Sequence, residues 1–192
     1  IQKVEHLLSN PGTYNQNLFI LDKNRVYGSV ESGYGVGDGK ASIGQTLCIQ
    51  TKFRLGSTND YDIYTANKLV KFDGDAFEPI YYDNGDKYQT SSMAGNAKFK
   101  VWYLTKIDGT NWKNQSEMNK TNIENLNIYE NLEDIPSNKK CIGLYFETIS
   151  GYISRITANN NVLMFLLRVK DTATIGQTYG LTQRSCFWKE VL

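Results

Sequence analysis

The chain has 192 residues, enough to bury a hydrophobic core without cross-links, so a small scaffold that depends on disulfides is excluded. Its 21 Lys and Arg residues balance 20 Asp and Glu residues to a formal net charge of +1, which argues against nucleic acid or an anionic membrane as a partner. With 40% hydrophobic and 12% aromatic residues, and no apolar run near the ~20 residues that span a bilayer, the sequence predicts a folded domain without membrane insertion.

Short apolar or alternating segments recur along the chain and indicate β-strands. The clearest alternation places Leu47 and Ile49 on one face and Gln50 and Lys52 on the other, with Cys48 on the polar side and therefore outside the deep core. The unbroken apolar run Val162–Leu167 predicts a strand that is covered on both faces, at the centre of the core. The expected strands lie near 18–30, 44–55, 98–105, 141–149, 162–170 and 178–187.

Clusters of Gly, Asn, Asp and Pro separate these segments and predict tight turns. Short strands joined in this way are typical of an all-β, mainly antiparallel β-sandwich, immunoglobulin-like or related. One small helical insertion is expected within 116–134, where Thr121–Glu124 has the form of a capping box. We expect a single domain over 1–192; two small β domains divided near residue 90 are the alternative.

Two charged residues interrupt apolar strands, and we expect Glu147 and Arg168 to form a cross-strand ion pair. A sharper alternative is an intramolecular isopeptide bond, in which a lysine amine attacks an asparagine amide beside a buried carboxylate. This reaction needs a desolvated, neutral lysine, and the candidate set is Lys71, Asn161 and Glu147.

Five acidic residues gather within fourteen positions, and their oxygens could bind calcium or act as a glycosidase pair. The spacing matches neither pattern closely, and Asp beside Gly or Asn is typical of turns. We expect ordinary turns and no required cofactor, and we keep calcium as an alternative. The calcium candidates are Asp73, Asp75, Asp83 and Asp86, with Glu78 between them.

Tyr81, Tyr82 and Trp112 could form a platform for stacking sugar rings, although packing in the core or at its rim is the simpler interpretation. The one histidine, His6, limits histidine-based catalysis and metal binding, and packing or exposure near the terminus is expected instead. The three cysteines are far apart in the sequence, and we expect separate buried or half-buried thiols, with one disulfide and one free thiol as the alternative. They are Cys48, Cys141 and Cys186.

Two six-residue segments agree at five positions, namely Ala41–Thr46 and Ala173–Thr178. Each contains an Ile-Gly-Gln-Thr sequence and precedes a segment that can form a strand. Local turn chemistry alone can produce such a pair, and common ancestry is the alternative. In either case we expect both segments to lead into strands at comparable places in the sandwich.

The segments Asn67–Pro79 and Val169–Tyr179, together with a composition rich in Asn and Tyr and poor in His, resemble β-sandwich repeat modules of large Gram-positive bacterial cell-surface proteins. The resemblance extends over about 41–180. It implies an extracellular adhesin or stalk module with an immunoglobulin-like or related fold, whose partner is a host or cell-wall protein or a glycan. The chain departs from the usual pattern in having three cysteines and no LPxTG-type sorting signal.

We therefore expect a non-enzymatic module at the cell surface that presents a binding face. A carbohydrate-binding module is the first alternative, and a hydrolase that uses two carboxylates is the second. The chain begins with Ile1 rather than Met, which is typical of a processed product or an excised domain. The sequons Asn114–Ser116 and Asn119–Thr121 keep open a glycosylated eukaryotic or viral ectodomain.

Overall fold

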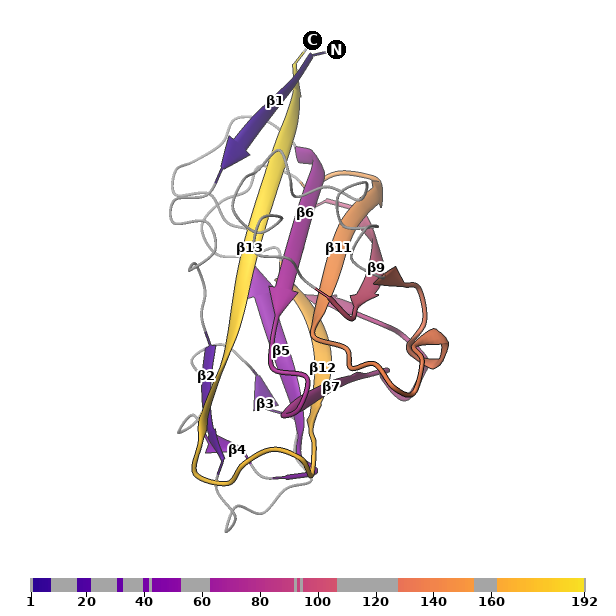
Figure 1. Ribbon diagram of the computed structural model, residues 1–192. Helices are drawn as coiled ribbons and strands as arrows, with labels where there is room; N and C mark the ends of the chain where they lie inside the picture. Colours follow the sequence, from indigo (N-terminus) through magenta and orange to yellow (C-terminus); the bar gives the residue numbers. More distant parts are fainter. Residues whose placement is uncertain are drawn as a thin grey trace.

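The computed structural model shows an all-β molecule whose strands form two sheets (Figure 1). It describes residues 2–7, 17–21, 31–32, 40–41, 43–52, 63–91, 93, 95–106, 128–153 and 162–191. Within these ranges the helical structure amounts to one 3-10 turn, Leu132–Asp134. No helix in the described ranges is long and apolar enough to cross a membrane.

The larger sheet has eight strands in the described residues and runs along the whole molecule. Its strand order is β10-β9-β11-β6-β13-β2-β4, and β1 also pairs with β13 beside the two ends of the chain (Figure 1). All its pairs are antiparallel except β2 with β4. The strands are β1 (Gln2–Leu7), β2 (Asn17–Leu21), β4 (Lys40–Ala41), β6 (Ile63–Lys71), β9 (Lys98–Leu104), β10 (Ile128–Tyr129), β11 (Gly143–Ser150) and β13 (Thr178–Val191).

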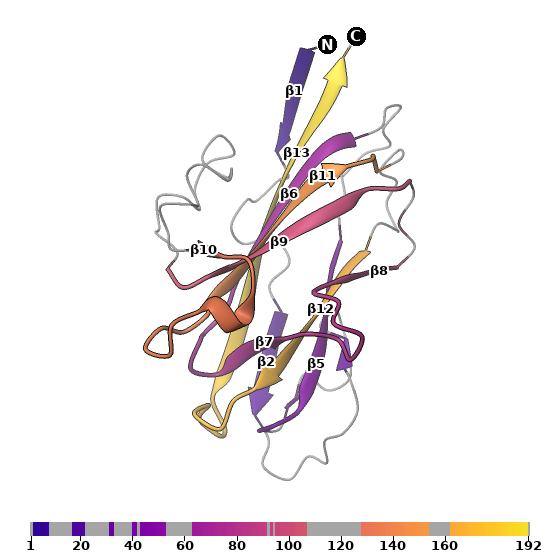
Figure 2. The same cartoon turned by 90° about the vertical axis from the view of Figure 1, so that its right-hand side faces the viewer.

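The smaller sheet has five strands and lies against one part of the larger one, as the turned view shows (Figure 2). Strand β12 is its centre, because it pairs with β5 on one side and with β7 and β8 on the other. Only β3 and β5 are parallel among its described pairs. The strands are β3 (Glu31–Ser32), β5 (Thr46–Lys52), β7 (Phe77–Ile80), β8 (Gln89–Ser91) and β12 (Val162–Val169).

The core lies between the sheets and contains alternate residues from the strands of both. Phe146 of β11 packs on Phe165 of β12 with ring centroids 5.7 Å apart, and Phe77 of β7 meets Tyr179 of β13 edge to face at 5.9 Å. These aromatic contacts join the sheets directly. The expectation of an all-β sandwich is confirmed.

The predicted strands are present with shifted ends. The segment near 18–30 contains β2, which ends at Leu21, and residues 22–30 lie outside the described part. The apolar run Val162–Leu167 forms most of the central strand β12, with Leu163 and Leu167 fully buried, as predicted. Cys48 is half-buried between the fully buried Leu47 and Ile49, which confirms its place on the polar face of β5.

Strand β6, which lies between β11 and β13 in the larger sheet, is not among the expected strands. Five successive residues of this strand, Ala66–Val70, are buried, so both of its faces are covered and no alternation marks it. Two of the five are polar, Asn67 and Lys68. A strand of this composition has no apolar run that would distinguish it.

Of the segment 116–134, where a small helical insertion is expected, the structure describes residues 128–134, which form strand β10 at Ile128–Tyr129 and the 3-10 turn Leu132–Asp134. Residues 116–127 lie outside that part of the chain. The 3-10 turn follows Asn131, whose backbone is extended (φ −127°). Its side chain donates to the Asp134 carboxylate at 3.1 Å, a local bond typical of Asn outside helices.

The predicted ion pair between Glu147 and Arg168 is wrong, because β11 and β12 belong to different sheets. Arg168 instead lies directly opposite Glu78 in the β12–β7 pair, where its Nε and Nη2 donate to one carboxylate oxygen. Glu147 faces Lys100 of β9 and Asn67 of β6 in register. Each charge is therefore placed by the neighbours in its own sheet.

The two similar six-residue segments take the same local role. Gly44 and Gly176 both have a left-handed backbone, with φ of 83° and 86°, and each stands two residues before a strand, β5 or β13. Both lie near β2, because Ile20 pairs with Lys40 and with Thr178. A shared turn with a required glycine explains the similarity at the structural level.

Candidate functional site

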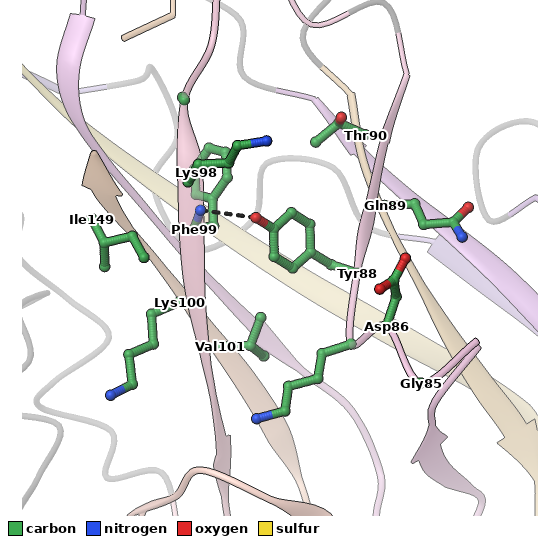
Figure 3. Close-up of a pocket in the computed structure, with 12 residues that line it drawn as sticks. Gly85, Asp86, Tyr88, Gln89, Thr90, Lys98, Phe99, Lys100, Val101 and Ile149 are labelled. Atoms are coloured by element: carbon green, nitrogen blue, oxygen red, sulfur yellow. Dashed lines mark hydrogen bonds between the residues drawn. The ribbon is translucent and has the colours of Figure 1, made fainter. Parts of the chain in front are cut away.

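A groove of about 700 Å³ lies between the edge of β9 and the segment that leads into β8 (Figure 3). One wall is Ala97–Val101 and the other is Gly85–Thr90, and Ile149 of β11 stands at the side. The volume is within the ~300–1,000 Å³ range of ordinary ligand sites. The groove is therefore large enough to bind a ligand.

The β9 wall is an open edge of the larger sheet. Strand β10 pairs with Tyr103 and Leu104, so in the described part of the chain Lys98–Trp102 has β11 as its strand neighbour on one side only. The Phe99 N–H points into the groove and donates to the Tyr88 hydroxyl at 2.9 Å. Because backbone groups alternate along an antiparallel strand, the N–H and C=O of Val101 point the same way as the Phe99 N–H.

Tyr88 connects the two walls of the groove. Its ring meets Phe99 edge to face at 5.9 Å and Phe146 at 6.3 Å, so it is anchored on the core. From this position its hydroxyl accepts the Phe99 N–H, as Figure 3 shows. One backbone donor of the open edge is thus satisfied by a side chain in place of a strand.

Three lysines line the groove, and they differ in their partners. Lys100 pairs with Glu130 at 2.6 Å and lies 5.1 Å from the centre of the Trp102 ring, and Lys87 donates to the backbone oxygen of Glu130 at 2.6 Å. Lys98 extends over the groove toward Thr90 in Figure 3, and within the described ranges it is outside the ion pairs. The acid in the lining is Asp86, which accepts from the Asn84 amide at 2.9 Å.

The tyrosines proposed as a sugar platform have structural contacts. The Tyr81 hydroxyl donates to Glu133 at 2.8 Å and accepts the Leu132 N–H at 2.7 Å, so it fixes the 3-10 turn. Tyr82 is half-buried, and its hydroxyl lies 4.0 Å from the Cys48 sulfur. Desolvation raises the pKa values of both tyrosines. Trp112 lies outside the described residues.

The acidic residues proposed for calcium occupy two separate turns. Asp73 accepts the Asp75 N–H at 2.8 Å in the turn between β6 and β7, where Asp75 also pairs with Lys140. The hydrogen bond and charge of Lys140 lower the pKa of Asp75. Asp83 and Asp86 are exposed in the later turn. This turn is closed by a backbone hydrogen bond, in which the Tyr82 N–H donates to the Asp86 carbonyl oxygen at 2.9 Å. Within the described ranges no three His, Cys, Asp or Glu side chains come together as metal ligands do.

The lysine proposed for an isopeptide bond does not have the desolvated environment that the reaction needs. Lys71 is exposed at the end of β6, Glu147 is half-buried on β11, and Asn161 lies outside the described residues. Among the lysines whose side chains the structure describes, the fully buried one is Lys68, which alternates with the core residues Ala66 and Val70 and so faces the sandwich interior. Burial lowers the pKa of Lys68 from 10.5 to about 7.

The described thiols are separate, and burial favours their protonated form. Cys48 and Cys141 are half-buried and free, as expected, whereas the side chain of Cys186 lies outside the described set. Desolvation raises the pKa of Cys48, and it raises that of Cys141 to about 11, so both remain protonated thiols near neutral pH. The backbone of His6 pairs with Phe187 in the β1–β13 ladder, and its side chain is not among those described.

The groove residues Tyr88 and Ile149 are not among the site residues expected from the sequence. The alternation Lys98–Phe99–Lys100–Val101 predicted a strand, but a strand pattern does not reveal which of its edges is paired. The signal that could have drawn attention to this edge is the presence of two lysines in one short strand, since lysine is common on exposed edges. The chain matches no protein-family model, no curated protein and no solved structure.

Proposed function

We propose that this chain is a non-enzymatic extracellular cell-surface module, an adhesin or stalk domain, that uses the groove along β9 as its binding face. The observation that carries the proposal is the open strand edge, Lys98–Trp102, at the side of a ligand-sized groove. Exposed strand edges recruit partner chains unless they are protected. The proposal therefore assigns a role to an edge that has no second strand neighbour among the residues that the structure describes.

The chemistry of the described side chains favours binding over catalysis. The thiols of Cys48 and Cys141 have raised pKa values, which disfavour the nucleophilic thiolate. The carboxylates of Asp73 and Asp86 accept hydrogen bonds within their own turns. A carboxylate-based hydrolase would need two of these acids on one cleft, and the turns hold them in different places.

The extracellular location is supported by the resemblance of Asn67–Pro79 and Val169–Tyr179 to cell-surface β-sandwich modules. The two-sheet arrangement is the architecture that this resemblance implied. Antibodies against the chain are expected to stain intact source cells without permeabilisation. Staining that requires permeabilisation would contradict the location.

A protein partner is favoured over a glycan at this groove. Sugar rings stack on exposed aromatic faces, whereas Phe99 is buried and Tyr88 packs edge to face against two core rings. The groove instead offers backbone groups, lysines and the exposed Ile149. These are the groups that bind polypeptides.

The test is the binding of dye-labelled chain to a panel of intact bacterial and animal cells. The variant Lys98→Glu with Ile149→Ser changes the groove, and Lys106→Glu with Ile175→Ser is the matched control, because Lys106 is exposed beyond the other end of β9 and Ile175 is 51% exposed in a turn outside the groove. We expect the groove variant to bind at least about tenfold more weakly and the control to match the wild type. Absence of binding to every cell type, or equal loss in both variants, would contradict the proposed function.

A further inference from the structure

We propose that the groove binds an extended peptide that adds as a strand to the open edge of β9, with an acidic residue beside Lys98 and apolar residues over Phe99 and Val101. This inference rests on the proposed function and specifies its ligand class. The open edge, the free lysine and an exposed isoleucine are three observations at one place. Each predicts a different property of the ligand.

The open edge predicts main-chain recognition. The N–H and C=O of Val101 and the C=O of Phe99 point into the groove, while Lys98, Lys100 and Trp102 direct their backbone groups toward β11. The direction of the second set is fixed by Leu104, whose oxygen accepts the Ile142 N–H at 2.8 Å on the β11 side. An incoming strand would follow the line of β10, which pairs at Tyr103 and Leu104. In the absence of the peptide, the Tyr88 hydroxyl accepts the hydrogen bond from the Phe99 N–H.

The side chains of β9 predict an alternating ligand. Phe99 and Val101 are buried on the core side, and Lys98 and Lys100 lie on the outer side of the same strand. Side chains directly opposite each other on paired strands share a face, so ligand residues next to the lysines should be acidic and those between them apolar. Lys100 already pairs with Glu130, which leaves Lys98 as the lysine for a ligand acid.

Ile149 supplies an apolar contact beside this strand. Its side chain is 62% exposed at the edge of the groove, the larger exposure of the two exposed large hydrophobic residues in the described chain. An apolar ligand residue that covers it removes this surface from water. Because β11 pairs with the other edge of β9, the ligand residue that covers Ile149 must be one whose side chain reaches over β9 beside Lys98.

A second copy of the chain fits the edge less well. Antiparallel pairing of two β9 edges would bring Lys98 and Lys100 of both copies onto neighbouring strands, and like charges in that arrangement repel. Because Lys100 is already paired with Glu130, the attraction for an acidic peptide comes from Lys98. Charge complementarity thus selects a foreign acidic strand over self-association.

The experiment is selection of random dodecapeptides displayed on phage against the immobilised full chain, with counter-selection against Lys98→Glu. We expect the enriched sequences to alternate acidic with apolar residues. Each of the three strongest is then synthesised, and its dissociation constant is measured by fluorescence anisotropy together with that of a copy N-methylated at alternate residues. N-methylation removes main-chain donors. We therefore expect the copy that is methylated at the residues whose N–H groups face β9 to bind at least about tenfold more weakly than the unmethylated peptide.

Variants of the chain provide the second arm with the same peptides. Lys98→Glu and Ile149→Ser are each expected to weaken binding about tenfold, and Lys106→Glu and Ile175→Ser to leave it within about twofold. Tyr88→Phe frees the Phe99 N–H and is expected to strengthen binding two- to fivefold. Thermal unfolding of each variant separates loss of the site from loss of the fold.

Several outcomes would overturn the inference. They are the enrichment of no sequences or of sequences without alternation, equal binding of N-methylated and unmethylated peptides, and a chain that forms β9-dependent dimers in place of a peptide complex. Self-association that appears only in Lys98→Glu, with no peptide binding by the wild type, would show that the lysine merely protects the edge. Cell binding that depends on the groove while no peptide binds would reject the peptide and leave the proposed function standing.

Discussion

At the scale of single residues, Lys68 is a lysine without exposed surface in the described part of the chain. It is fully buried on the core face of β6, between Ala66 and Val70, and burial lowers its pKa from 10.5 to about 7. The unfolded chain therefore binds more protons than the folded chain between these two pH values. The folded state gains stability as the pH rises through this window.

We predict that the free energy of unfolding rises by about 1 kcal/mol between pH 7.5 and 8.5 in the wild type. The variant Lys68→Met, which keeps the length of the side chain and removes the charge, should lose most of this slope. Urea unfolding followed by fluorescence measures it. At higher pH the raised pKa values of Cys48 and Cys141 oppose the trend, because unfolded thiols ionise first. A slope that is the same in both proteins would place the lysine in water.

The pair of Arg168 and Glu78 belongs to the surface. The two side chains are 53% and 36% exposed, so solvent and salt screen their attraction. A double-mutant cycle with Arg168→Met and Glu78→Gln should give a coupling energy below ~1 kcal/mol that falls in high salt. The cycle of Arg168→Met with Glu147→Gln serves as the control and should give a coupling near zero. If the coupling energy between Arg168 and Glu147 were larger than that between Arg168 and Glu78, the placement of β12 beside β7 would be contradicted.

At the scale of elements, two glycines separate the effect of backbone conformation from that of close packing. Gly176 has φ of 86° and open space where the Cβ of an alanine would stand, so Gly176→Ala should cost about 1 kcal/mol from conformation alone. Gly151 has φ of 74°, and a Cβ there would lie 2.4 Å from the Asn96 oxygen.

We therefore predict that Gly151→Ala is the more destabilising change, by at least ~2 kcal/mol beyond Gly176→Ala, because overpacking adds to the conformational cost. The clash would displace Asn96, whose N–H donates to Tyr152 at 3.0 Å beside the Gly95–Ile153 bridge. Chemical denaturation of the two variants gives the comparison. Equal costs would show that the Asn96 segment yields easily.

The elements also show what sequence patterns reveal and what they miss. Alternation in β5 and the apolar run of β12 are sufficient to predict these two strands, because β5 buries alternate residues and β12 is buried along most of its length. Strand β6 escaped prediction because both of its faces are buried and it contains Asn67 and Lys68. The groove could not be predicted, since it depends on where strands pair: β10 pairs with β9 only at Tyr103 and Leu104, and in the described ranges no strand covers this edge at Lys98–Trp102. Pairing between distant strands also overturned the expected partner of Arg168.

At the scale of the whole molecule, the division of the chain near residue 90 is still a prediction to be tested. The strand order interleaves the two halves, because β6 lies between β11 and β13, and β12 lies between β5 and β7. We therefore predict one cooperative unfolding transition and no stable half after limited proteolysis. Two resistant fragments that separate near residue 90, or two calorimetric transitions, would favour two domains.

The central claim is that β9 has an accessible edge that receives a partner strand, and amide hydrogen exchange tests it most directly. Val101 N–H should exchange at least about tenfold faster than Trp102 N–H in the free chain, because Val101 points into the groove and Trp102 donates toward β11. A bound acidic peptide should slow exchange at Val101 and leave Trp102 unchanged. Equal protection of the two amides in the free chain, or no slowing at Val101 when the peptide is bound, would contradict the account.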